Sequence, residues 1–246
     1  MDTSDEKITE YFGRYHAAYR DSARHAQGQD LSHLIEALDL APQSQVLDAA
    51  CGTGHTSLAL AQQGHRVTGM DLTPEMLNEA KLLAGQKKLS VTWETGDVHQ
   101  LPWPDQTFDA VTCRRAAHHF RDLPKFLAQV YRVLKPAGLL GISDMTAPSV
   151  AVDDLNQLER LRDSSHQRAR SANQWAALVG QAGLDLRYLQ VSVEPMLPTE
   201  WLSPVAAESS EGIQAMDYLH STNVAPGLLV NGNFHKYRII LVALKP

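Results

Sequence analysis

The stretches Val46-Leu-Asp-Ala-Ala-Cys-Gly-Thr-Gly54 and Val67-Thr-Gly-Met-Asp71 decide the fold of this chain. In the first, an apolar strand runs into an acid, and a pair of glycines then opens a helix. Glycines there let the backbone approach a ligand without a Cβ in the way. The second stretch is a strand that ends in Asp71, and an acid at that place suits the two hydroxyls of a ribose. The pattern predicts that the nucleoside half of a cofactor lies across these strand ends.

Two features distinguish between nucleoside cofactors. The dinucleotide fingerprint is Gly-x-Gly-x-x-Gly after a strand, and its third glycine would fall on Ser57. Asp48 precedes the glycines, where a carboxylate repels a pyrophosphate but attracts a cation. A dinucleotide is therefore the weaker interpretation. A cofactor that carries an ammonium and a sulfonium fits better, and S-adenosylmethionine carries both.

Five segments, in order, resemble the motifs of class I S-adenosylmethionine-dependent methyltransferases. Together they cover roughly residues 44–145, and the resemblance rests on all of them because any one alone is a weak signal. The segments are Val46–His55 and Gly69–Leu77, which resemble the first two motifs, Gly96–Pro104, Phe108–Cys113, and the turn Val133–Gly138.

The resemblance implies an α/β fold, a Rossmann-like seven-stranded mixed sheet in the order 3-2-1-4-5-7-6, with strand 7 antiparallel and helices on both faces. The alternation of strands and helices after Pro42 itself predicts a parallel sheet. We expect a single domain over residues 1–246, made of an N-terminal helical cap or lid (1–41), a cofactor-binding core (42–145), an insertion after strand 5 that caps the substrate (146–171), and the rest of the core (172–246).

The later part of the chain is harder to interpret. Hydrophobic periodicity predicts helices over Val152–Arg162 and Asn173–Gln181, and strands over Leu184–Val193 and Phe234–Leu244. Residues 197–222 are expected to be irregular or helical.

At the methionine end of the cofactor, the resemblance implies roles for residues of two strand ends. Asp48 would face the amino group, directly or through a water, and the backbone of Ala50, Gly52 and Gly54 would approach the same part. The backbone near Arg114 would meet the amino group from the fourth strand. The alternative for Asp48 is helix capping or bracing of the loop.

At the adenosine end, the resemblance implies that Asp71 accepts hydrogen bonds from both ribose hydroxyls. Leu72 and Met76 would lie against the adenine, and a third-motif acid would accept from its amino group. The alternative is that these acids merely cap turns at strand ends. The third-motif residues expected at the adenine are Gly96, Asp97 and Val98.

His118 and His119 follow the fourth strand, beside the expected position of the methyl group. His119 is the candidate catalytic residue, as a general base or a substrate contact, and His118 is a candidate substrate contact. The alternative is a polar, partly packed helix start. No metal is expected, because adjacent histidines point apart on a helix and no carboxylate stands at metal-ligand spacing.

The insertion contains Leu161–Arg168, which is dense in groups that can pair with a carboxylate or phenolate. In the family such insertions usually cover the acceptor, so Arg162 and His166 are predicted substrate contacts. The alternative is a brace to the core, with Arg162 paired to Asp163 or Asp144.

Tyr11, Tyr15 and Tyr19 recur every four residues and therefore share one face of the first predicted helix. As a lid, this helix would place Tyr19 at the cofactor and Tyr15 at the substrate. A stripe that merely packs in the core is an equal alternative.

Composition narrows the class of protein. The net charge is −6 and no basic stripe is present, so nucleic acid is not an expected partner. No apolar run approaches a membrane span, and the first residues carry no apolar signal region. Two cysteines, Cys51 and Cys113, cannot make a disulfide framework. We expect a cytoplasmic protein, a monomer or homodimer.

Within the family, the cofactor half resembles the UbiE-like (methyltransferase type 11) branch, the ubiquinone and menaquinone biosynthesis C-methyltransferases. Those enzymes carry Phe-Gly-x-Arg-Asn after the fourth strand, where this chain has Arg114-Arg-Ala-Ala-His-His-Phe120. A quinone acceptor is therefore doubtful, and the pattern is closer to uncharacterised bacterial small-molecule methyltransferases.

Methyl transfer from a sulfonium is an in-line displacement, and positioning alone can contribute roughly 7–11 kcal/mol. The absence of an obvious catalytic triad does not count against an enzyme. The function predicted first is methyl transfer from S-adenosyl-L-methionine to a small, cyclic or aromatic metabolite, with S-adenosyl-L-homocysteine as product. The alternatives are a cofactor-binding protein without transfer activity, as regulator or scaffold, and a nicotinamide oxidoreductase.

Overall fold

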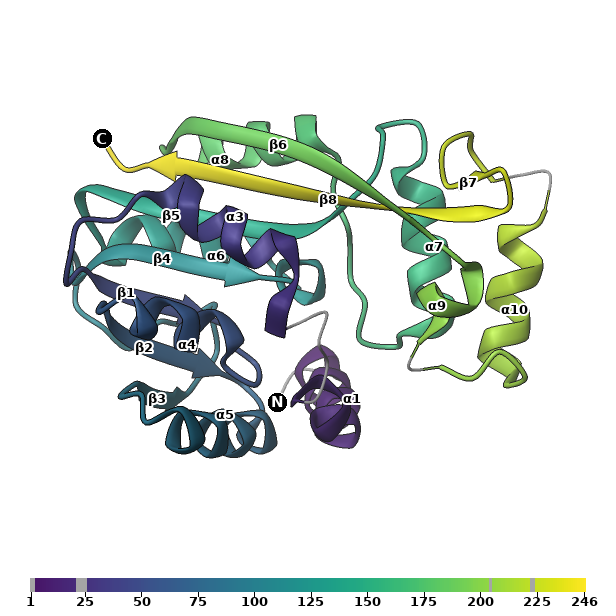
Figure 1. Ribbon diagram of the computed structural model, residues 1–246. Coiled ribbons are helices and arrows are strands. Elements are labelled where there is room, and N and C mark those ends of the chain that lie inside the picture. The colour runs from purple at the N-terminus through teal and green to yellow at the C-terminus, as the bar shows by residue number, and fades with distance from the viewer. Residues whose placement is uncertain (1–2, 21–25, 204, 222–223) are drawn as a thin grey trace.

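The computed structural model describes residues 3–20, 26–203, 205–221 and 224–246 (Figure 1). Residues 1–2 and 21–25 of the predicted N-terminal cap lie outside the described residues. The strands are β1 (Gln45–Ala49), β2 (Arg66–Asp71), β3 (Thr92–Thr95), β4 (Phe108–Arg114), β5 (Leu134–Thr146), β6 (Asp185–Met196), β7 (Leu229–Val230) and β8 (Asn233–Leu244). The helices are α1 (Thr3–Arg20), α3 (Gln29–Leu38), α4 (His55–Gln62), α5 (Pro74–Lys87), α6 (Leu123–Val133), α7 (Val152–Arg162), α8 (Ala172–Gln181), α9 (Pro198–Leu202), α10 (Ser210–Leu219) and a 3₁₀ turn, η1 (Ala117–His119).

One mixed sheet runs through the molecule in the order β3-β2-β1-β4-β5-β8-β6. β8 is antiparallel to both of its neighbours, β5 and β6, and the five strands from β3 to β5 are parallel to one another. This confirms the predicted Rossmann-like order. Strand order reverses between β1 and β4, and open α/β sheets bind ligands at such a switch point.

A short additional strand, β7, was not predicted. It pairs with β8 through a two-residue turn in which Asn231 and Gly232 both have positive φ, 50° and 78°. An Asn-Gly pair favours this hairpin turn because both residues tolerate the left-handed conformation. Within the described residues the sheet therefore has eight strands, of which the two-residue β7 lies beside the main order.

Helices cover both faces of the sheet because alternate strand residues point to opposite sides. On one face, Leu34 and Leu38 of α3 pack against Ile240 and Val242 of β8. On the other face, α6 and α8 bury Phe126 and Trp175 in the largest core cluster. The ligand-binding edge is left free for the loops that follow each parallel strand.

A second hydrophobic core lies beyond the end of β5, where α7, α9 and α10 gather around the far ends of β6 and β8 (Figure 1). We call this part, the described residues among 146–171 and 196–230, the cap lobe. Its buried centre includes Trp201, which stacks on Phe234 with ring centroids 4.6 Å apart. Residues 172–246 were predicted to form the rest of the core, and among the described ones Trp201, Leu202, Ala215 and Leu219 belong to this second core.

The described helices are short or carry many polar residues. None of them is long and apolar enough to cross a bilayer.

Candidate active site

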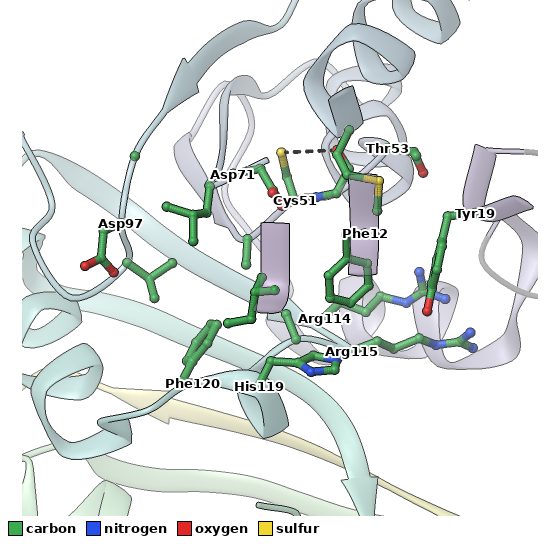
Figure 2. A pocket seen from close by; sticks show the side chains of 18 of the residues that line it. Phe12, Tyr19, Cys51, Thr53, Asp71, Asp97, Arg114, Arg115, His119 and Phe120 are labelled. Carbon is green, nitrogen blue, oxygen red and sulfur yellow. Dashed lines mark hydrogen bonds between the residues drawn. The ribbon is translucent and has the colours of Figure 1, made fainter. Parts of the chain in front are cut away.

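A pocket opens at the carboxyl ends of β1, β2 and β4 and beside the loop after β3 (Figure 2). Residues of α1 and of η1 complete its wall. In Figure 2 Asp97 lies at one end of the pocket, Asp71 and Cys51 lie between, and Tyr19 and Arg115 lie toward the other end. The predicted site residues that line it are Tyr19, Ala50, Gly52, Asp71, Leu72, Met76, Gly96, Asp97, Val98, Arg114 and His119.

The loop after β1 is shaped by left-handed backbone. Ala50, Gly52 and Gly54 have φ angles of 55°, 55° and 81°. A Cβ on Gly54 would come within 2.6 Å of the Trp93 ring, and its φ is one that L side chains rarely adopt. Gly54 caps the start of α4 and does not line the pocket, so this glycine serves close packing.

Asp71 ends β2 with its carboxylate held by backbone. The N–H of Gly52 donates to Oδ2 at 2.7 Å, and the N–H of Thr73 donates to Oδ1 at 2.9 Å. A carboxylate oxygen can accept more than one hydrogen bond, so both oxygens of Asp71 retain acceptor capacity toward the pocket. Burial raises the pKa of Asp71, and the two N–H groups oppose that rise.

Asp97 follows β3 and binds two groups. Its Oδ1 accepts the backbone N–H of His99 at 2.9 Å and lies 2.6 Å from the ring Nδ1. Its Oδ2 accepts from Arg121 at 2.6 Å, and the same guanidinium also pairs with Asp5 of α1. Although burial would raise it, these hydrogen bonds hold the pKa of Asp97 below its usual value.

Asp48 lies beneath the pocket and does not line it. Its Oδ2 accepts from the hydroxyl of Ser57 at 2.6 Å, and its Oδ1 accepts from the hydroxyl of Thr112 at 2.9 Å. Burial raises the pKa of Asp48 to about 6, and the two hydroxyls oppose the rise. Ser57, at the place of the missing third glycine, therefore binds the acid that precedes the loop.

At the end of β4, two arginines share one acid. Arg114 donates to Asp30 of α3 at 2.8 and 3.0 Å, and Arg115 donates to the same carboxylate at 2.6 and 3.1 Å. Arg115 has a φ of 57°, which turns the chain back toward α3. Both arginines line the pocket, so this ion cluster forms part of its wall.

α1 closes one side of the pocket, with Ile8, Phe12 and Tyr19 in its wall. His16 and Arg20 fasten α1 to α5, since Glu79 lies 2.8 Å from the His16 ring and 3.0 Å from Arg20.

The other two tyrosines of the predicted stripe belong elsewhere. Tyr11 and Tyr15 line a separate hollow between α1 and the cap lobe, so the three tyrosines do not share one wall.

Three histidines converge from two segments. The rings of His118 and His119 lie 4.0 Å apart, and the ring of His166 lies 5.6 Å from His118 and 6.5 Å from His119. Of the three, only His119 lines the pocket, where its ring also meets Phe12 edge-on at 5.0 Å. Burial lowers the pKa of His119 to about 4, and repulsion from His118 adds to this.

His118 and His166 are held by buried partners. The N–H of His118 donates to Asp144 at 2.9 Å, and its ring Nδ1 lies 2.5 Å from the same carboxylate. The Nε2 of His166 lies 2.8 Å from the side-chain oxygen of Asn156.

Arg162 also lies outside the pocket wall. It pairs with Glu159 at 2.7 Å and stacks over the ring of Trp201 at 5.5 Å. It is thus a brace within the cap lobe, with Glu159 as partner in place of the Asp163 or Asp144 considered from the sequence.

Several lining residues were not singled out from the sequence. Phe12 and Ile8 could have been found, since positions 8, 12 and 19 lie on one side of a helix with a period of 3.6. Arg115, Phe120 and His99 carry no such local signal. Among the described residues no group of three or more His, Cys, Asp or Glu side chains is arranged to hold a metal ion. Cys51 and Cys113 are both free thiols.

Comparison with known proteins identifies the family to which this chain belongs. A family model described as "Methyltransferase domain" matches residues 47–142. An uncharacterized methyltransferase of Bacillus subtilis, YcgJ, is 34% identical over 212 residues, which cover 85% of this chain and 84% of that protein. The crystal structure of YcgJ superposes with a TM-score of 0.80 at 32% identity, covering 88% of this chain and 97% of that chain.

A second relative has a named activity. The demethylmenaquinone methyltransferase of Deinococcus radiodurans is 41% identical over 116 residues, which cover 46% of this chain and 48% of that protein. This similarity is confined to about half of each chain. Because the match to YcgJ covers most of both chains, this chain belongs to the S-adenosylmethionine-dependent methyltransferases.

Proposed function

We propose that this methyltransferase acts on a small-molecule acceptor that reaches the pocket between α1, η1 and the cap lobe. The observation that carries the proposal is the wall made by Phe12, Tyr19 and His119, which stands over the end of the pocket away from Asp97. A polymeric acceptor needs an open groove beside the reacting atoms, whereas a small molecule fits beneath a helix. The net charge of −6 also does not suit nucleic acid.

The residues of the pocket fit S-adenosylmethionine. Asp71 retains acceptor capacity for a ribose diol, and apolar side chains of Leu72, Met76 and Val98 line the adjacent wall, as a purine ring requires. We assign the adenine amino group to Oδ2 of Asp97, which keeps an acceptor site beyond its bond to Arg121, whereas Oδ1 already lies against the N–H and the ring Nδ1 of His99. When bound, the cofactor supplies a methyl group activated by a positively charged sulfur.

For the methionine end, the proposed contacts are backbone groups near Gly52 and Arg114. Asp48 is assigned a supporting role there, because its carboxylate is satisfied by Ser57 and Thr112 and lies beneath the loop. Its negative charge remains a source of attraction for an ammonium above the loop.

Catalysis would rest mainly on positioning. His119 is neutral near pH 7, because its pKa lies at about 4, so its ring can accept a hydrogen bond or a proton from an acceptor. His118 and Asp144 would position it, since the two rings pack together and Asp144 fixes the His118 ring. Arg162, His166 and Tyr15 would contact only those parts of an acceptor that extend into the cap lobe.

The two free thiols, Cys51 and Cys113, are consistent with a reducing compartment, and we include the cytoplasm in the proposal.

The test is transfer of an isotope-labelled methyl group. Purified protein is incubated with S-adenosylmethionine labelled in its methyl group and with either the small-molecule fraction or the macromolecular fraction of a bacterial extract. We expect label in a small molecule, lost when Asp71 is replaced by Ala. Label found only in protein or RNA would overturn the small-molecule proposal, while binding of S-adenosylhomocysteine without any transfer would support the non-catalytic alternative.

A further inference from the structure

The face of β8 that packs on α3 carries basic residues where it passes the end of the cofactor pocket. Arg238 and Lys236 lie two residues apart and therefore point to the same side of the strand. Along that side, Ile240 packs on α3 and Phe234 packs in the cap lobe, so the two basic residues stand between the helical face and the cap lobe.

Positive charge exceeds negative charge at this place. The carboxylate of Asp30 faces three guanidiniums: Arg114 and Arg115 hydrogen-bond to it, and Arg238 lies 3.8 Å away. Asp30 neutralises one of these cations. Asp144 and Asp48 also attract Arg238 and Arg114, but Asp144 is bound to His118 and Asp48 to Ser57 and Thr112, so they offset the remaining positive charge only in part. The nearby Arg162 does not change this balance, because Glu159 already pairs with it at 2.7 Å.

Lys236 adds a further charge, and its ammonium group has no hydrogen bond or ion pair within the described part of the chain. Glu194 is its cross-strand neighbour in the β6–β8 register, yet the two form no ion pair. Burial and then repulsion from Arg238 and Arg162 lower the pKa of Lys236 to about 7, with Glu159 acting in the opposite direction. The fold thus holds an ammonium group in a place that disfavours its charge.

A buried tyrosine hydroxyl without a hydrogen-bond partner lies near Arg162, whose charge also acts on Lys236. The hydroxyl of Tyr11, a residue of α1, is buried and makes no hydrogen bond of good geometry within the described residues. Its neighbours include Tyr19 and the charges of Arg162 and Asp163. Buried polar groups without partners are rare in folded proteins, and they indicate a missing ligand atom or water.

We propose that Arg115, Arg238 and Lys236, here called the cationic cluster, bind an oxyanion of the methyl acceptor, so that the acceptor is a small molecule with a carboxylate or phosphate group. Arg115 joins the cluster to the pocket, because it lines the pocket wall at the end away from Asp97 (Figure 2). Lys236 and Arg238 do not line the cofactor pocket, which places their charges beyond the cofactor. This inference rests on the proposed small-molecule function.

An oxyanion at the cluster would neutralise the excess charge and would accept from Lys236 as a charge-assisted hydrogen bond. It would also fix one end of the acceptor, while the other end reaches the wall formed by His119 and Phe12. Orientation from one charged anchor is the kind of positioning that in-line transfer requires.

The first experiment compares Lys236→Met with Lys81→Met, a substitution of an exposed lysine on α5. Protein saturated with S-adenosylhomocysteine is titrated calorimetrically at pH 6.5 with inorganic phosphate, phenyl phosphate, benzoate and neutral benzyl alcohol. We expect at least one oxyanion to bind the parent protein, benzyl alcohol not to bind, and Lys236→Met to weaken oxyanion binding at least tenfold. The Lys81→Met protein should bind as the parent does.

Comparison of benzoate with the two phosphates identifies which oxyanion the cluster prefers. Absence of binding by every oxyanion, or equal binding by Lys236→Met and the parent, would overturn the inference. If Lys236→Met instead loses affinity for S-adenosylhomocysteine, the cluster serves the cofactor's own carboxylate and the inference is also wrong. Failure of the parent to bind S-adenosylhomocysteine at all would contradict the proposed function. The experiment therefore distinguishes failure of the proposed function from failure of the cationic cluster.

Thermal unfolding gives a second readout that does not depend on the shape of a probe. Without an oxyanion, Lys236→Met should melt above the parent, because it removes an unpaired cation. Phosphate should raise the Tm of the parent more than chloride at equal ionic strength does, and this gain should vanish in Lys236→Met. A lower Tm for Lys236→Met, or no difference between phosphate and chloride, would count against the cationic cluster as a binding site.

Discussion

Arg121 and Asp97 form an ion pair at 2.6 Å, and the same arginine holds Asp5 of α1. The residue proposed to bind adenine is thus tied to the helix that closes the pocket. Replacing Arg121 with Gln should loosen α1 and weaken S-adenosylhomocysteine binding by about 1 kcal/mol, the scale of partly exposed ion pairs. Calorimetry measures the affinity, and hydrogen exchange over residues 3–20 should rise.

Arg187→Gln provides the control, because Arg187 pairs with Asp185 on an exposed strand away from the pocket. Unchanged exchange of α1 in Arg121→Gln would show that this ion pair does not hold the helix.

Asp71→Ala should weaken S-adenosylhomocysteine binding by roughly 1.5–3 kcal/mol, the scale of hydrogen bonds to a charged acceptor. The affinity is measured by calorimetry below the melting temperature of each protein, since the N–H groups of Gly52 and Thr73 also lose their acceptor. The control is Asp105→Ala at an exposed carboxylate. An unchanged dissociation constant in folded Asp71→Ala would remove the ribose assignment.

His119 should make the protein less stable as the pH falls. Its folded pKa is about 4, below the value of roughly 6.5 expected when unfolded. The unfolded chain therefore binds the proton more tightly, and stability present above pH 6.5 is lost between pH 6.5 and 4. The His119→Gln protein lacks this contribution. Between pH 7 and 4.5 its free energy of unfolding should therefore fall by about 2 kcal/mol less than that of the parent protein.

Urea unfolding at the two pH values measures this difference, and His220→Gln, at an exposed histidine, is the control. Equal losses of stability in the parent and in His119→Gln would contradict the lowered pKa of His119.

Gly54→Ala and Gly64→Ala separate backbone strain from packing. Both glycines have similar φ angles, 81° and 87°, but a Cβ on Gly54 meets Trp93 at 2.6 Å whereas one on Gly64 meets nothing within 4 Å. Gly64→Ala should destabilise by about 1–2 kcal/mol from the left-handed backbone alone. Gly54→Ala should destabilise by roughly 1–3 kcal/mol more, because it overpacks the loop. Equal losses in chemical denaturation would mean that Trp93 moves aside freely.

Local patterns predicted the parallel strands and the residues at their ends. Asp71 and Asp97 could be placed because a strand, a turn and an acid follow one another within a few residues, and their strands pair in the predicted order. The same logic placed Gly52 in the pocket wall. These features depend on residues that are close in sequence, so one sequence is enough to predict them.

The remaining parts of the site depend on how distant segments dock. Asp30 of α3 meets Arg114 and Arg115 only after α3 packs on the sheet, and nothing near Asp30 in the sequence marks that partner. The tyrosines of α1 also divide between two hollows, because a spacing of four residues drifts around a helix of 3.6 residues per turn. Tyr19 therefore shares the pocket with Phe12, while Tyr15 faces elsewhere.

The cap lobe has its own hydrophobic core, whose members, apart from Met145, lie in residues 147–234, beyond the segment 47–142 that matches the family model. Under the function proposed above, in which the acceptor lies beneath the cap lobe, a substitution at Leu155 or Ala215 would reshape the region over the acceptor without disturbing the strand ends proposed to bind the nucleoside. On that proposal, mutations confined to the cap lobe would change which compound is methylated, while the residues proposed to bind the methyl donor stay intact. Swapping that unit between homologues offers a direct route to re-targeted enzymes.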